Sequence, residues 1–164
     1  NGQILSSIDF QSMTDGLAAE LCSGDQLQAL RENAEDALLV PDFVELGLLQ
    51  TGSIGLVLGE RFRASLNSIC KVPIRQVDLS RDLSLSPAGL VALTRDGSAV
   101  RTKRFSASSM MVGTYDLQPG RLTLVTRQVS MDTGVIKKMA TKEVMWRCGR
   151  SFLTGRSSLQ KVMK

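Results

Sequence analysis

The sequence contains no histidine, and this absence excludes several kinds of site before any motif is considered. Catalysis by Ser-His-Asp or Cys-His groups, histidine-ligated zinc and a histidine pH switch all require the imidazole ring. Three cysteines, Cys22, Cys70 and Cys148, are too far apart in sequence for a C-x-x-C motif. In an oxidising compartment two of them could pair, whereas in a reducing compartment all three would be small buried residues.

Long apolar runs are also absent. The longest stretches, such as residues 54–58, fall far short of the roughly 18–20 residues that a membrane-spanning helix needs. The chain starts without a methionine or a charged-then-apolar leader, so we expect a mature or trimmed chain from which a leader has been removed. With 164 residues, 43% of them hydrophobic, the sequence suits one globular domain, because domains usually hold about 100–200 residues.

Acidic residues are missing from the last part of the chain, which therefore carries the net charge of +4. Residues 147–164 hold five basic residues and no acidic ones, whereas residues 1–146 are almost neutral. These five are the candidate partner-binding residues: Arg147, Arg150, Arg156, Lys161 and Lys164. Because Leu159, Val162 and Met163 lie among them, we expect a tail that is flexible or a short basic amphipathic helix. It could bind an acidic partner or associate peripherally with a membrane.

Hydrophobic spacing predicts helices and strands in alternation over the first half. The expected elements are a helix over 10–21, a short helix over 27–38, a strand over 39–46, a helix over 53–69 and a strand over 72–79. Ser53 is the expected N-cap of the last helix. Pro41 cannot donate a hydrogen bond to a neighbouring strand, so it places its strand at an edge or a bulge, or moves the start to Asp42.

The second half has the pattern of antiparallel strands separated by Gly and Pro turns. The expected elements are a hairpin over 83–94, a polar loop over 96–109 and three strands over 109–117, 121–131 and 135–146. The order of elements predicts an α/β (α+β) domain over residues 1–146, with helices packed on a single mixed β-sheet and a C-terminal three-stranded antiparallel meander. Residues 147–164 form the basic tail.

Two features could indicate chemistry, and both have a structural interpretation. Residues 51–59 follow a strand and open a helix, where a phosphate-binding loop would lie, but they lack the G-K-[ST] sequence. Close packing of the helix on the sheet explains their glycines better. Asp42 with Glu45, or Asp78 with Asp82, could pair as carboxylates, although structural or solvated roles suit them better. We predict no catalytic residue, cofactor or metal site.

Six strings follow one another in order along the chain: LVPDFVEL at 39–46, GLVLGE at 55–60, LSPAG at 85–89, VALTRD at 91–96, VGTY at 112–115 and TGV at 133–135. Each alone is common in strands, helices or turns. Their order and spacing resemble the FlgO family, flagellum-associated proteins of the Gram-negative cell envelope, over roughly residues 10–146. Residues 97–108 depart from the family pattern, which has a helix there, and so does the basic tail.

The resemblance implies a fold akin to the TolB N-terminal and CsgG-type domains. It also implies a location in the periplasm or at the outer membrane of a Gram-negative bacterium, a role in flagella or motility, and no enzymatic activity. Family members are often lipoproteins attached through an N-terminal cysteine, whereas this chain has no cysteine before Cys22.

The function we predict is that of a non-enzymatic envelope protein, which docks to protein partners and supports the assembly or stability of the flagellum at the outer membrane. An accessory subunit of a pilus or secretion system is the alternative within the same class. A polyanion or nucleic-acid binding module is the alternative from another class, and aromatic residues, at 4% of the chain, offer little for base stacking. The cysteine pairing, the partner machine and the oligomeric state stay open.

Overall fold

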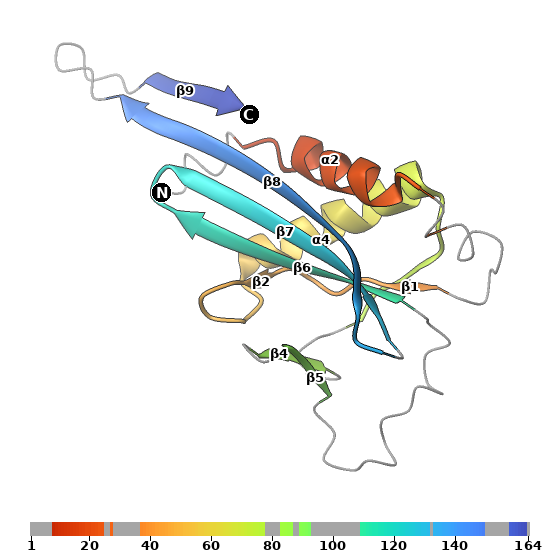
Figure 1. The fold of residues 1–164 in the computed structure, drawn as a ribbon. Helices are drawn as coiled ribbons and strands as arrows, with labels where there is room; N and C mark the ends of the chain where they lie inside the picture. Colours follow the sequence, from red (N-terminus) through yellow and green to blue (C-terminus); the bar gives the residue numbers. More distant parts are fainter. Residues whose placement is uncertain are drawn as a thin grey trace.

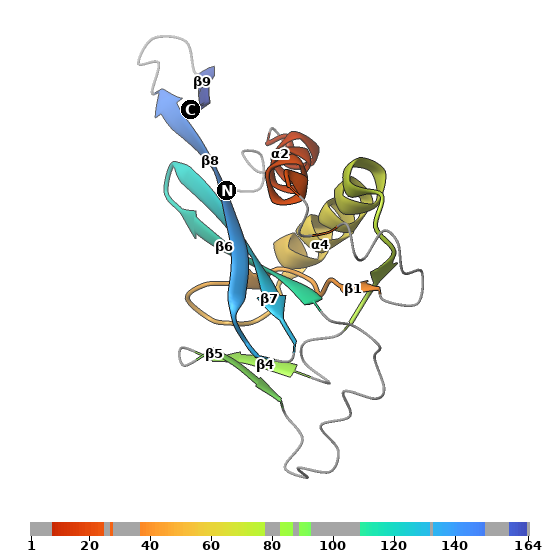
Figure 2. The same cartoon turned by 45° about the vertical axis from the view of Figure 1, so that its right-hand side comes forward.

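The computed structural model describes residues 8–24, 27, 37–77, 83–86, 89–92, 109–131, 133–149 and 158–163, with the backbone alone for 83–86, 89–92, 147–149 and 158–163. In this part of the chain, helices α2 and α4 lie on one face of a mixed β-sheet (Figure 1). The view turned by 45° shows the same two layers (Figure 2). The predicted α+β fold, with helices packed on a mixed sheet, is confirmed.

The first described helix, α2, spans Phe10–Cys22, as the apolar spacing predicted. Asp9 caps it, because its Oδ1 accepts a hydrogen bond from the backbone N–H of Ser12 at 3.0 Å. The buried side chains recur at helical spacing and are Thr14, Leu17, Ala18 and Leu21. Most of the helix predicted over 27–38 lies outside the described residues.

The next helix, α4 (Ser53–Ser65), runs directly into the π-helix η2 (Leu66–Cys70), and together they confirm the helix predicted over 53–69. The N-cap is Gly52 and not Ser53, and no side chain caps the first turn. A Cβ at residue 52 would lie 3.1 Å from the Tyr115 hydroxyl oxygen, so this position favours a residue without a side chain.

The strand predicted over 39–46 is split into β1 (Leu38–Leu39) and β2 (Val44–Glu45), which both pair with β6. Pro41 lies in the break: β1 before it is flanked by β3 and β6, whereas β2 begins beyond it at Val44 and pairs with β6 alone among the described strands, so the alternative of a later strand start holds for β2. The chain leaves the sheet there because the Phe43 N–H donates to the carbonyl of Gly55 in α4, at 3.2 Å.

The strand predicted over 72–79 is shorter, and forms β3 (Ile74–Arg75), parallel to β1. The N–H groups of Leu38 and Val40 donate to the carbonyls of Pro73 and Arg75, at 2.9 and 3.0 Å. The hairpin predicted over 83–94 is confirmed as β4 (Leu83–Ser86) and β5 (Gly89–Ala92), but it forms a two-stranded sheet of its own.

The predicted meander is confirmed as β6 (Ser109–Gln118), β7 (Arg121–Ser130) and β8 (Ile136–Gly149). The strands pair antiparallel in sequence order. Gly120 and Gly134 have φ of 81° and 69° in the connecting turns, a conformation that favours glycine. The loop predicted over 96–109 lies outside the described residues, apart from its last residue.

The tail contains a strand where we predicted a flexible arm or a short helix. Strand β9 (Ser158–Met163) pairs antiparallel with Val144–Gly149 of β8. Because β8 continues past residue 146, the sheet extends beyond the predicted domain boundary. The edge of β8 presents unpaired backbone groups, which an added strand satisfies and a helix does not. The helix interpretation is therefore wrong for residues 158–163.

Two apolar clusters stabilise the sheet from opposite faces. The larger lies between the sheet and the helices and includes Phe43 and Phe62, whose ring centroids are 5.5 Å apart in an edge-to-face arrangement. The smaller cluster comprises Leu39, Val77, Met110, Val112 and Val129, with Met131 packed against it.

Cys22 and Cys70 form a disulfide between the last residue of α2 and the last residue of η2, with Cα atoms 5.5 Å apart. The structure thus selects one of the cysteine states that the sequence left open. Cys148 lies on β8. Neither α2 nor α4, nor any other helix in the described ranges, has the length and apolar character needed to span a bilayer.

Candidate functional site

Along each strand of the meander, successive side chains point to opposite faces of the sheet. On β7, Leu122 and Leu124 are buried on the helix side, whereas Arg121, Thr123 and Arg127 are only half-buried on the opposite side. We call this opposite side of β6, β7 and β8 the open face. Neither α2 nor α4 lies over it (Figures 1 and 2).

One end of the open face carries acidic side chains that contact hydrogen-bond donors and a basic residue beside them. The register places Thr123 between Asp116 of β6 and Glu143 of β8. The Thr123 hydroxyl donates to Glu143 Oε2 at 3.1 Å, and Arg121 Nε lies 3.9 Å from the same oxygen. Asp116 Oδ2 accepts a hydrogen bond from Gln118 Nε2 at 2.8 Å. This end is therefore a network of exposed polar groups that partly satisfy one another.

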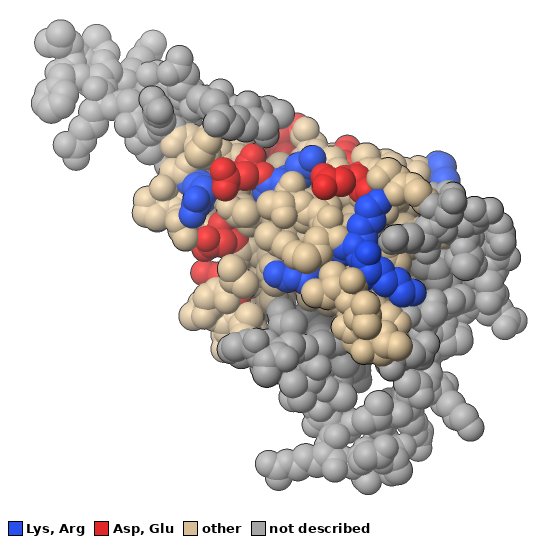
Figure 3. Space-filling model, viewed as in Figure 1, with Lys and Arg blue, Asp and Glu red and all other residues tan. Residues whose placement is uncertain are grey.

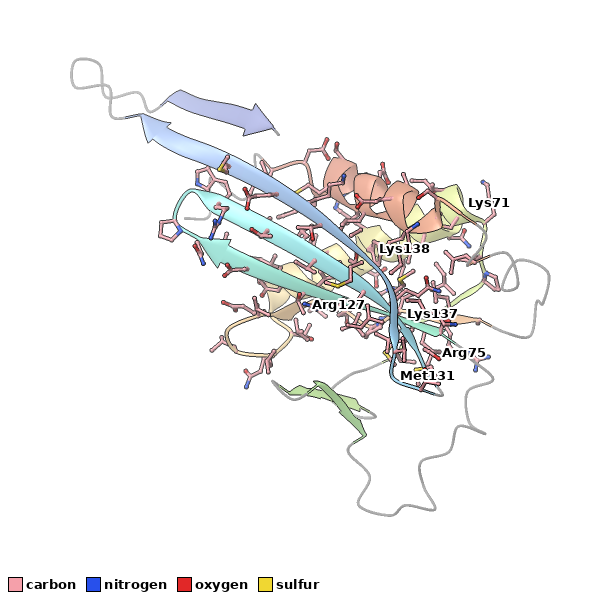
Figure 4. The ribbon with its side chains drawn as sticks, viewed as in Figure 1. Lys71, Arg75, Arg127, Met131, Lys137 and Lys138 are labelled. Carbon is pink, nitrogen blue, oxygen red and sulfur yellow. A yellow bond between two sulfur atoms is a disulfide. The ribbon has the colours of Figure 1, made fainter. Side chains whose placement is uncertain are left out.

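The other end of the open face is basic, and blue atoms gather there in Figure 3. We call Arg75, Arg127 and Lys137 the basic end; Figure 4 labels all three. Arg75 and Lys137 are exposed, and Arg127 is half-buried with Nη1 donating to Thr114 Oγ1 at 3.4 Å. Within the described part of the chain, none of the three forms an ion pair. Their charges are therefore available to a partner.

Lys137 owes its position to an irregularity in the sheet. The register pairs Gln128 with Lys138 and Val129 with Ile136, so Lys137 is an extra residue in β8 opposite no partner. Its neighbour Lys138 points to the helix side, where Nζ donates to the Ser23 hydroxyl at 3.0 Å. The bulge thus separates two adjacent lysines, one held by α2 and one exposed.

Three large apolar side chains are exposed beside the basic end, where β7 turns into β8. Val135, Ile136 and Met139 are 57%, 47% and 48% exposed, and we call them the apolar tip. Two backbone hydrogen bonds of 2.9 Å close the turn, from Ser130 N–H to Val135 O and from Gly134 N–H to Ser130 O. This turn therefore presents exposed apolar side chains next to basic residues that form no ion pair within the described part of the chain.

The structure describes only two of the five basic residues that the sequence singled out, and only by their backbone. Arg147 lies on β8 opposite Gln160, and Lys161 lies on β9 opposite Trp146. Arg150, Arg156 and Lys164 lie outside the described residues. The binding role of these five residues stays a prediction.

Sequence reasoning missed the basic end and the apolar tip. Counting charge by segment hid them, because acidic residues elsewhere in 1–146 balance the basic ones. One signal was visible: Val135 and Ile136, both apolar, directly precede the doublet Lys137-Lys138 after a turn. A turn in a soluble domain usually carries polar residues, so this sequence indicates an exposed apolar site.

The carboxylate proposed for acid/base chemistry has a structural role. Asp42 Oδ1 lies 2.9 Å from Arg63 Nη2, and Arg63 Nη1 donates to the Val40 carbonyl at 3.2 Å.

The other titratable groups of the described residues give no sign of catalysis. Burial raises the pKa of the Tyr115 hydroxyl, and the charge of Glu45 raises it further. Asp78 and Asp82 lie outside the described residues. Among the described residues, no group of three or more acidic or cysteine side chains could hold a metal ion.

The glycines of α4 confirm close packing and contradict a phosphate-binding loop. A Cβ at Gly55 would collide with the carbonyl oxygen of Phe43, and one at Gly59 would collide with Asp42. The helix therefore lies against the segment between β1 and β2 at a distance that only glycine permits.

Comparison with known proteins gives one family and two similar structures. The protein-family model described as FlgO protein matches residues 15–147. No match was found among curated proteins. The LpoB C-terminal domain from Salmonella enterica is 15% identical with a TM-score of 0.49, covering 84% of this chain and 99% of that one. The LpoB C-terminal domain from Escherichia coli has the same identity and TM-score, with coverages of 82% and 96%. At this level of similarity the two structures bear on neither function nor partner.

Proposed function

The chain belongs to the FlgO family, and from this premise we propose that it is a non-enzymatic cell-envelope protein that docks to protein partners. Through this docking it supports the assembly or stability of the flagellum at the outer membrane of a Gram-negative bacterium. Attachment through a lipidated N-terminal cysteine, as is common in the family, belongs to the same proposal.

The disulfide supports the envelope location. Cys22 and Cys70 are joined across two helices, and structural disulfides persist in the periplasm but are rare in the reducing cytosol. The bond links residues 48 positions apart, so its loss would free a long loop of the chain. A protein that needs this bond is suited to an oxidising compartment.

The observation that carries the docking function is the open face. Neither α2 nor α4 covers this face, which presents a polar network at one end and, at the other, exposed apolar side chains beside basic ones that form no ion pair within the described residues. On the helix side, by contrast, the nearly buried Arg63 is paired with Asp42. Such an arrangement offers surfaces for partners and places its buried charges in structural contacts.

The basic tail is the second part of the docking proposal. Strand β9 extends the sheet beside β8 and brings the backbones of Arg147 and Lys161 onto neighbouring strands. We propose that the five basic residues of the tail bind an acidic surface of the protein partner.

Cell fractionation of the full-length protein in its native host, followed by a pull-down from the membrane fraction, tests the function. The decisive variant replaces Arg147, Arg150, Arg156, Lys161 and Lys164 with glutamine. Its matched control exchanges lysine and arginine at the same five positions, which keeps the charge. We expect flagellar ring or rod proteins to co-purify with the wild type and the control, and to be reduced severalfold with the glutamine variant, together with motility.

Other outcomes assign the alternatives. Recovery of pilus or secretion subunits would show that the domain serves another envelope machine. A cytosolic protein that releases nucleic acid as salt rises would overturn the envelope proposal. Equal recovery of flagellar proteins by the wild type and both variants would support the proposed function but would show that the basic residues of the tail do not contribute to it. Labelling with a radioactive fatty acid decides the lipid anchor.

A further inference from the structure

The apolar tip lies beside Arg127 and Lys137 at the β7–β8 end of the sheet, and Arg75 lies across the sheet on β3. Ile136 and Met139 belong to the open face, because they lie opposite Val129 and Arg127 in the register. Val135 precedes them in the turn and is the most exposed of the three, at 57%. Hydrogen bonds close this turn, so the apolar side chains are held outside both cores.

The positive charges of this surface are spread widely and do not converge. Arg75 of β3 and Ile136 of β8 stand at opposite ends of one row that crosses the sheet through Leu39, Met110 and Val129. Adjacent strands are about 4.8 Å apart, so the two ends of the row are about 19 Å apart. A single small anion cannot contact both Arg75 and the β8 end of this row, whereas an extended anionic surface can contact both.

The combination of a projecting apolar turn and flanking basic residues selects the kind of partner. An acidic peptide binds best in a groove or along a strand edge. A bilayer interface instead accepts protruding apolar side chains among its acyl chains, while its anionic headgroups attract the lysine and arginine beside them. We propose that the apolar tip and the basic end are a peripheral binding site for a bilayer rich in anionic phospholipid. The proposal rests on the envelope location proposed above.

In this arrangement the apolar tip enters the interface and the basic end contacts the headgroups. Val135, Ile136 and Met139 lose their remaining water contact on insertion. Lys137, unpaired in the β8 bulge, reaches the headgroups next to them. The acidic end of the open face, with Asp116 and Glu143, lies at the far end of the strands and so away from the negative membrane.

Vesicle co-sedimentation with the purified, disulfide-bonded chain tests the proposal. The vesicles contain equal parts of phosphatidylglycerol and phosphatidylethanolamine, and phosphatidylcholine vesicles serve as the neutral comparison. We expect binding to the anionic vesicles only, with an affinity that falls as salt rises. Inorganic phosphate at the same charge concentration should not displace the protein, because a single anion does not replace the surface.

Two double variants remove the two parts of the site. Arg75→Gln with Lys137→Gln should weaken vesicle binding about 25-fold, since each basic residue near an anionic surface contributes about fivefold. Ile136→Ser with Met139→Ser should weaken it at least about tenfold through lost apolar burial. All four side chains are exposed at least in part and form no ion pair in the described structure, so both variants should keep the wild-type melting temperature.

Matched variants elsewhere on the surface are the controls. Arg61→Gln with Arg121→Gln removes the same charge away from the β7–β8 end, and should change binding less than about threefold. Leu48→Ser with Leu56→Ser removes apolar side chains that are 65% and 52% exposed, and should also leave binding unchanged. Equal losses with site and control variants would mean non-specific attraction and would overturn the proposal.

The remaining outcomes separate this proposal from the proposed function. Absence of vesicle binding overturns the membrane site, and binding of poly-glutamate that the same two site variants weaken would assign the surface to an acidic protein instead. Co-purification of flagellar proteins from cells is a separate readout that does not depend on the tip. The function can therefore hold while the membrane site fails, and the vesicle result can hold while the partner machine proves to be different.

Discussion

The two faces of the meander are built from alternate residues of the same strands, yet they differ in burial: the helix side carries the larger core, whereas the open face has a smaller buried cluster and exposed side chains at both ends. On the helix side, Leu122 and Leu124 are completely buried, and each such side chain contributes about 2 kcal/mol by leaving water. On the open face, Arg127 and Met139 stand at neighbouring register positions with much of their surface in water. Substitutions of buried side chains should therefore change folding, and substitutions of exposed ones should change binding.

The disulfide on the helix side should give the largest effect on folding. Replacing Cys22 and Cys70 with serine frees a loop of 48 residues, and the expected cost is about 4 kcal/mol of unfolding free energy. Urea denaturation of the double variant beside the wild type measures it. Thiol titration of the denatured wild type checks the pairing itself and should find one free thiol per chain, that of Cys148. Finding three would contradict the bond.

The contact between α4 and the β1–β2 segment should come next. Gly55→Ala places a methyl group against the carbonyl oxygen of Phe43, and the backbone there cannot move without breaking the Phe43–Gly55 hydrogen bond. We expect a loss of about 3 kcal/mol, measured by thermal or urea unfolding. Gly47→Ala is the matched control, because no atom lies within 4 Å of its added Cβ. A control that destabilises as much as the variant would refute the packing argument.

The ion pair at the same junction should contribute less. Arg63 has a side chain only 9% exposed, and Asp42→Ala leaves its guanidinium without its buried partner. We expect a loss of about 2 kcal/mol, below the range for completely buried pairs because the Asp42 carboxylate is 18% exposed. Glu60→Gln is the control: its side chain is 70% exposed, and its removal should cost less than about 0.5 kcal/mol. Urea unfolding of both variants measures which of the two carboxylates stabilises the fold through its contact with Arg63.

Gln128 is a polar exception on the buried face, and its replacement should stabilise the protein. Its amide nitrogen and oxygen are completely buried and have no hydrogen-bond partner. Gln128→Met keeps the length of the side chain and removes two unsatisfied groups, so we expect a gain of about 1 kcal/mol. A rise in melting temperature measures the gain. A fall would mean that the amide is satisfied by a bound water that the variant displaces.

Local sequence patterns were sufficient for the meander but not for the sheet around it. Period-two alternation and the glycines at 120 and 134 are local signals, and they gave the strands and turns correctly. Pro41 signalled the interruption of the first strand, but the contact of Phe43 with α4 and the pairing of β9 with the edge of β8 had no local signal. Both are contacts between residues distant in sequence, which periodicity does not report.

The basic end could not be predicted for the same reason. Arg75, Arg127 and Lys137 come from β3, β7 and β8, and only the register across the sheet places them at one end. The basic tail, by contrast, was visible in the sequence, because its five basic residues lie within one segment that contains no acidic residue. Counting charge along the sequence therefore finds basic residues that lie in one segment. It misses basic residues that come from different strands and are brought together by the fold.

A substitution at the acidic end of the open face should change the free energy of unfolding least. Glu143→Gln weakens the exposed contact with Arg121 at 3.9 Å but leaves an acceptor for the Thr123 hydroxyl. Exposed ion pairs of this geometry contribute little, so we expect a change of about 0.3 kcal/mol or less in urea unfolding. The same variant should leave vesicle binding unchanged, since residue 143 lies far along β8 from the apolar tip. A loss above about 1 kcal/mol would show that the exposed polar network stabilises the fold as the buried clusters do, and the contrast between exposed and buried side chains would then be wrong.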